Sequence, residues 1–225
     1  MSTFITKTPL FQVVVLALVS SFMLAFLFLS LEPTVSQAVT STFTVRQQIT
    51  SEISFLVSAA NVTMAGTLAG ITGGNATGTT YAVIQTNQAT GYTMDIAFSN
   101  SPAMLGEVTG STAIRNYGST TEPTYNFFAS TSAVFAYTVN ASTTSDIDQS
   151  FLNNGSACNA GAGQTANTCW MGASTTNFRI INRGSAALTG ATTSLQFKVN
   201  VPSNPSPGLQ ADFYTATATL TAVTQ

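Results

Sequence analysis

Residues 213–223 read FYTATATLTAV, and this stretch decides the fold class. Its residue types alternate with a period of two. One set is aromatic or aliphatic and the other is mainly threonine; the first set comprises Tyr214, Ala216, Ala218, Leu220 and Ala222. Successive side chains of a β-strand point to opposite faces, so the alternation predicts a strand with one buried face. We expect the face that carries Tyr214 and Leu220 to pack against the core.

Stretches of similar character occur throughout the chain after residue 38. They are rich in valine, isoleucine, threonine, tyrosine and phenylalanine, which favour strands, and are bounded by residues that favour turns. The predicted strands are 43–49, 53–57, 81–86, 92–98, 112–117, 125–129, 133–139, 178–182, 194–201 and 213–223. About nine to eleven short strands predict an all-β fold, and we expect a single immunoglobulin-like or jelly-roll-like β-sandwich over residues 39–225.

The N-terminal part of the chain has a different pattern. Residues 9–31, PLFQVVVLALVSSFMLAFLFLSL, carry no charge, and Lys7 precedes them. About 20 apolar residues suffice to cross a bilayer as a helix, and the lysine favours a cytoplasmic N-terminus. Small residues at Ser36 and Ala38 suit a signal peptidase that cuts after Ala38. Residues 1–38 are therefore a signal peptide or a membrane anchor, and we expect an extracellular or cell-surface domain that contacts the membrane only through residues 9–31, if they are retained.

Composition excludes several classes of function. The 225 residues include six Lys and Arg, eight Asp and Glu and no His, for a net charge of −2. A chain without a basic cluster lacks the charge that nucleic-acid binding needs, and the absence of histidine excludes catalytic triads and most zinc sites. We expect no enzymatic activity and no cofactor. The neutral polar surface instead favours self-association or binding to other surface proteins.

The two cysteines and the adjacent tryptophan form the most distinctive local motif. Cys158 and Cys169 bracket CNAGAGQTANTC, and in an exported protein such a pair predicts a disulfide. Trp170 follows directly. Its aromatic ring either packs in the core against the bridge or forms an exposed platform on which a sugar ring stacks.

A second polar motif is Asp146-x-Asp148, followed by Asn153-Asn154-Gly155. Carboxylate and carbonyl oxygens on a flexible loop are the ligands that Ca²⁺ prefers, so Asp146 and Asp148 are candidate metal ligands. The alternative is a solvated turn that binds nothing.

Three segments resemble a broad group of prokaryotic secreted β-sandwiches, including spore coat protein U, pilin-like and TasA-like fibre subunits. The segments are ISFLVSAANVTMAGTLAGITGG at 53–74, YAVIQTNQATGYTMDIAFSN at 81–100 and FKVNVPSNPSPGLQADFYTATATLTAV at 197–223. The resemblance implies a structural subunit that, in some relatives, polymerises by donating a terminal strand to a neighbour's open sheet edge. Residues 39–49, VTSTFTVRQQI, are the segment that we expect to be donated.

Two functions therefore compete. The first is an exported, non-enzymatic structural surface protein or fibre subunit, and it requires an unpaired sheet edge that complements residues 39–49. The alternative is an extracellular binding module or adhesin for carbohydrate or another surface ligand. That alternative requires aromatic side chains such as Trp170, with Tyr117 or Tyr125, to lie exposed on one face.

Overall fold

The computed structural model describes residues 9–31, 38–128 and 130–225. The chain divides into two compact units, Met1–Gln48 and Ile49–Gln225. Of the expected cleavage-site residues, Ser36 lies outside the described residues and Ala38 within them.

The first unit contains one helix, α1 (Pro9–Ser30), which coincides with the predicted apolar segment. Residues Leu10–Ser30 have a mean hydropathy of 2.6 and exposed side chains, so this helix is long and apolar enough to cross a membrane. A signal sequence has the same properties. Residues 38–48 follow without regular secondary structure. The strand predicted at 43–49 is thus not formed, because no described strand pairs with it.

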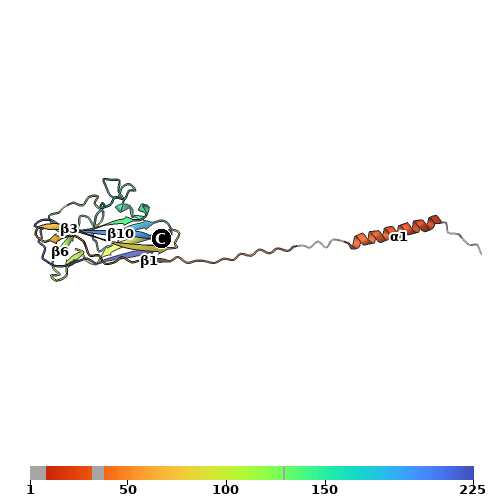
Figure 1. Cartoon of the computed structure of the whole chain (residues 1–225), viewed down its shortest axis with the longest axis horizontal. Coiled ribbons are helices and arrows are strands. Elements are labelled where there is room, and N and C mark those ends of the chain that lie inside the picture. The colour runs from red at the N-terminus through yellow and green to blue at the C-terminus, as the bar shows by residue number, and fades with distance from the viewer. Residues whose placement is uncertain (1–8, 32–37, 129) are drawn as a thin grey trace, which may run out of the picture. The chain divides into compact units, whose positions relative to one another are not determined.

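The second unit is built from strands, with two short 3₁₀ helices between them (Figure 1). The strands are β1 (Ile53–Val57), β2 (Leu68–Ala69), β3 (Gly73–Thr86), β4 (Tyr92–Phe98), β5 (Met104–Gly106), β6 (Ala113–Asn116), β7 (Val134–Ala141), β8 (Met171–Gly172), β9 (Phe178–Arg183), β10 (Ala187–Val201), β11 (Tyr214–Thr215) and β12 (Ala218–Thr224). The 3₁₀ helices are η1 (Thr144–Asp146) and η2 (Gln149–Phe151). The prediction of a mostly β chain behind an apolar helix is confirmed.

The strands form two sheets. The larger has the order β1-β3-β10-β7-β6-β5-β11, with β2 added to β3 and β8 to β7. Its centre is the long antiparallel pair of β3 and β10, which run side by side in Figure 1. The smaller sheet has the order β12-β4-β9, so β12 is at its edge.

Both sheets contribute to one hydrophobic core. Phe98 of β4 meets Phe135 and Tyr137 of β7, with ring centroids 5.8 and 5.6 Å apart. The row of rings continues through Phe135 to Phe197 of β10, at 6.0 Å. Tilted and edge-to-face pairs at such separations are favourable beyond their burial. The alternation in residues 213–223 is confirmed in part: Tyr214, Ala216, Leu220 and Ala222 pack on this core, whereas Ala218 is exposed.

Candidate assembly surface

The outer edge of β12 has no strand partner among the described residues. Ala218–Thr224 pair with Phe98–Tyr92 of β4 in an unbroken antiparallel register, and β12 ends the order of its sheet. Such an edge presents a row of free N–H and C=O groups, which form a template for another strand. The structural-subunit hypothesis requires an unpaired edge that also complements residues 39–49.

A large cavity lies beside this edge, and its lining combines apolar core side chains with polar groups such as Asn61, Glu107 and Asp212. Its volume is about 1190 Å³, and its lining includes core side chains of four strands: Ile96, Phe98, Phe135, Leu195, Phe197, Val199 and Leu220. The exposed side chains of Ile71 and Phe213 also line it, so the cavity reaches the surface. Protein interiors are close-packed and have few voids larger than a water molecule. The cavity is therefore an opening beside the core and not a sealed void, and the core side chains Ile96, Phe98, Phe135, Leu195 and Val199 that line it are each at most 4% exposed.

Residues 39–49 carry apolar side chains of the kind that line the cavity. Val39, Phe43, Val45 and Ile49 share one face of an extended chain, and each is at least 83% exposed. The opposite face carries only Thr40, Thr42, Thr44, Arg46 and Gln48. Exposed apolar side chains at this density are typical of an interaction segment.

The C-terminal end of this segment is fixed to the second unit. Asn87, just after β3, accepts a hydrogen bond from Glu52 N–H through Oδ1 at 2.7 Å. Its Nδ2 donates to Thr50 O at 2.9 Å. In addition, Thr86 Oγ1 donates to Glu52 O at 2.6 Å. These bonds anchor residues 50–52, directly after the segment, to the end of β3.

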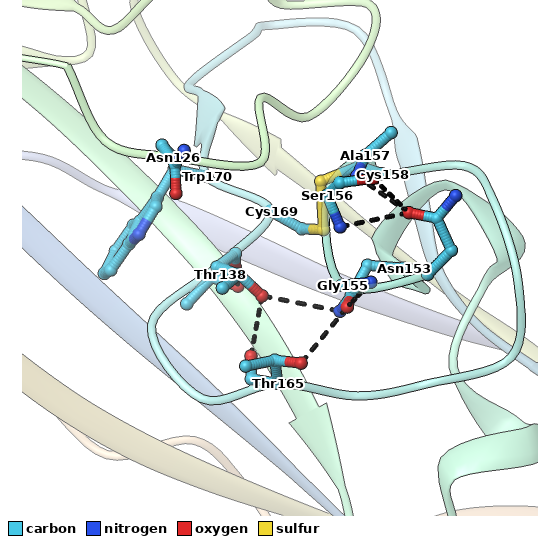
Figure 2. The surroundings of a disulfide bond; sticks show 12 residues. Asn126, Thr138, Asn153, Gly155, Ser156, Ala157, Cys158, Thr165, Cys169 and Trp170 are labelled. Atoms are coloured by element: carbon cyan, nitrogen blue, oxygen red, sulfur yellow. Dashed lines mark hydrogen bonds between the residues drawn. A yellow bond between two sulfur atoms is a disulfide. The ribbon is translucent and has the colours of Figure 1, made fainter.

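The predicted disulfide between Cys158 and Cys169 is present and closes a polar loop (Figure 2). The loop folds around Asn153, which the sequence analysis did not single out as central. Its backbone exchanges two hydrogen bonds with Gly163, at 2.9 and 3.0 Å. Its Oδ1 accepts from Gly155 N–H and Thr165 Oγ1, both at 3.1 Å. A buried asparagine and a covalent bond thus take the place of an apolar core in this loop.

We expect the double substitution Cys158→Ala and Cys169→Ala to lower the free energy of unfolding by about 2–3 kcal/mol. The bridge joins residues 11 apart, and in the chain-entropy model it removes conformational freedom from the unfolded chain. Urea unfolding followed by circular dichroism measures the change. Asn154→Ala in the same loop is the control, because its side chain is exposed and bonds only to residues 156 and 157. A double variant as stable as the unchanged protein would show that the bridge does not stabilise the fold.

Trp170 lies inside the protein, which corrects the hypothesis of an exposed stacking platform. It is 2% exposed, its Nε1 donates to Asn167 O at 2.9 Å, and its ring meets Phe127 edge to face at 5.6 Å. Figure 2 shows the indole pointing away from the disulfide, so it does not pack on the bridge either. Lys198 Nζ lies 4.2 Å from the Phe127 ring centroid, and burial lowers the pKa of Lys198.

Tyr117 belongs to the same interior cluster. It is buried, and its ring stacks on Phe127 with centroids 4.4 Å apart. Tyr117 and Trp170, two of the aromatic residues that the adhesin hypothesis requires at the surface, are thus brought together, but both are buried. The arrangement does not favour the carbohydrate-binding alternative.

Asp146 and Asp148 are both bound by protein groups. Asp146 forms a buried ion pair with Arg183. Asp148 Oδ1 accepts from Ser150 N–H at 3.1 Å and from Ser150 Oγ at 2.6 Å, which caps η2. No cluster of three or more Asp, Glu, His or Cys occurs in the part of the chain that the structure describes. These contacts account for both carboxylates without a metal ion.

Comparison of the chain with protein-family models, with curated protein sequences and with solved structures finds no match in any of the three.

Proposed function

We propose that this protein is an exported, non-enzymatic structural protein of the cell surface that assembles into fibres by strand donation. In this proposal the second unit is an immunoglobulin-like or jelly-roll-like sandwich with an incomplete core. Residues 39–49 of one copy complete the core of the next. The single observation that carries the proposal is the open cavity of about 1190 Å³, lined in part by apolar core side chains, beside the unpaired edge of β12.

The dimensions of the donated segment suit this edge. An extended chain rises about 3.3 Å per residue, so residues 39–49 span about 36 Å and the seven residues of β12 about 23 Å. Pairing along β12 gives the incoming backbone a ladder of hydrogen bonds. The alternate side chains of Phe43 and Val45 then enter the cavity, and each fully buried side chain of this size contributes about 1.5–3 kcal/mol.

Charge does not oppose the association. Arg46 is the only charged residue within 39–49, and it lies on the face opposite Phe43. β12 carries no charged residue. Repulsion between copies is therefore small, and the interaction depends on backbone pairing and apolar burial. The apolar helix α1 supports export, and the disulfide suits an oxidising compartment.

Electron microscopy of the mature protein, recovered from the surface of cells that export it, tests the proposal. We expect filaments from the unchanged protein and none after deletion of residues 39–49. Filaments that survive the deletion, or an unchanged protein that remains monomeric at high concentration, would overturn the proposal.

A further inference from the structure

One edge of β3 is left partly uncovered. β1 pairs with residues 83–86 of β3, and an isolated bridge joins Ala65 to Thr77. The backbone groups of Thr77 turn toward this edge, since its N–H donates to Ala65 O at 2.9 Å and its O accepts from Ala65 N–H at 2.7 Å. With a period of two, Thr79 and Tyr81 turn their backbone groups the same way. No described residue pairs with these two positions on that side.

The edge is uncovered because residues 58–64, here called the strap, leave the ladder and turn inward. Thr80 is 6% exposed, and its hydroxyl replaces the missing backbone bonds. It accepts from Ala60 N–H and donates to Ala60 O, both at 2.9 Å. Further along the strap, Val62 occupies the space above Gly78. A Cβ added to that glycine would lie 2.3 Å from Val62 Cγ1.

The strap also borders the cavity. Ala59, Ala60, Val62 and Met64 line it, as does Leu220 of β12. Two of these four side chains are alanines. Within residues 58–64 the backbone is bonded to β3 through the Thr80 hydroxyl group, and the next residue, Ala65, is bonded to Thr77. An incoming strand could offer larger side chains and backbone bonds to Thr79 and Tyr81.

We propose that the strap is a displaceable plug of the acceptor cavity, which must move aside before residues 39–49 of another copy can enter. This inference rests on the proposed function and adds the step that controls its rate. The strap covers part of the core in the free subunit, and its displacement opens the cavity beside the edge of β3 that is already unpaired. Contacts that hold the strap therefore slow assembly.

Thr80→Val is the test, because valine has the shape of threonine but cannot bond to Ala60. The hydrogen bonding of Thr80 to Ala60 should contribute about 1.4 kcal/mol, which is within the usual range for hydrogen bonds. Its loss corresponds to a tenfold change in the equilibrium between the bound and the displaced strap. We expect filaments of the mature Thr80→Val protein to grow about tenfold faster, as measured by light scattering. The matched control is Thr189→Val, which makes the same substitution at a threonine whose side chain is exposed on β10 and is not bonded to the strap; its rate should not change.

A second variant guards against a folding defect at Thr80. Gly78→Ala places a methyl group where Val62 lies, so it should push the strap outward and also accelerate growth. Hydrogen exchange should show faster exchange of the Ala60 amide in both variants. If the unchanged protein assembles and neither variant grows faster, the strap is not a plug, although the proposed function stands. If the unchanged protein does not assemble, the proposed function and this inference both fail.

Discussion

Protein carrying Phe43→Asp is expected to remain monomeric, whereas protein carrying Thr44→Asp forms filaments as the unchanged protein does. The two residues are neighbours, but they lie on opposite faces of an extended chain. In the proposed complex Phe43 enters an apolar cavity and Thr44 faces solvent. A carboxylate buried without a partner costs several kcal/mol, so we expect assembly to weaken by at least about 100-fold. Sedimentation velocity and electron microscopy measure the result.

The Thr44→Asp protein is the matched control, because it carries the same added charge one residue away. Phe43→Leu is a second control, since leucine remains apolar and should keep most of the assembly. Equal loss in the two aspartate variants would mean that charge alone blocks association. Full assembly by Phe43→Asp would mean that this face does not enter a neighbour.

The strands that can be predicted from the sequence are those in which apolar and polar residues alternate strongly over a short segment. The predicted strand 92–98 coincides with β4, and the predicted strand 178–182 differs from β9 by one residue. The strand predicted at 213–223 divides into β11 and β12, and its halves join different sheets. Periodicity identifies which face of such a segment is buried, but not where the chain passes from one sheet to the other.

The missed strand residues have poor local signals. Residues 73–80, GGNATGTT, contain three glycines and no aromatic side chain, and they form the first half of β3. They are held by pairing with β10, in a register from Gly74↔Val201 to Thr86↔Ala187. Tertiary pairing here overrides local propensity. Conversely, the strand predicted at 125–129 does not form over residues 125–128, and residue 129 lies outside the described residues. Phe127 packs on Tyr117 and Trp170 instead of joining a ladder.

The candidate site likewise has one part that the local sequence reveals and one part that depends on tertiary structure. The segment that we propose to be donated is visible in the sequence, because the alternation of Val39, Phe43, Val45 and Ile49 needs no knowledge of the fold. The acceptor is not visible, because its cavity joins residues as distant as Phe98 and Leu220. The inward turn of the strap could not be predicted either, since it depends on one hydroxyl group of β3.

Arg183→Met is expected to lower the free energy of unfolding by about 3–5 kcal/mol, the usual cost of breaking a buried ion pair by removing one partner. The Arg183 side chain is 17% exposed and that of its partner Asp146 is 10% exposed. Arg183 also donates from Nε to Ser185 O at 2.9 Å and from Nη2 to Ala186 O at 3.0 Å. The substitution therefore leaves a buried carboxylate and two carbonyl groups without their donor. Urea unfolding measures the loss.

Arg179→Met is the control on the same strand, and it separates the buried pair from the general loss of an arginine. Arg179 lies 3.7 Å from Asp95 through Nε, but its side chain is about half exposed. Exposed pairs typically contribute about 0–1 kcal/mol, so this variant should unfold close to the unchanged protein. Similar losses in both variants would show that burial does not decide the cost. A double variant with Asp146→Leu should recover part of the stability lost in Arg183→Met, because no unpaired charge then remains in the interior.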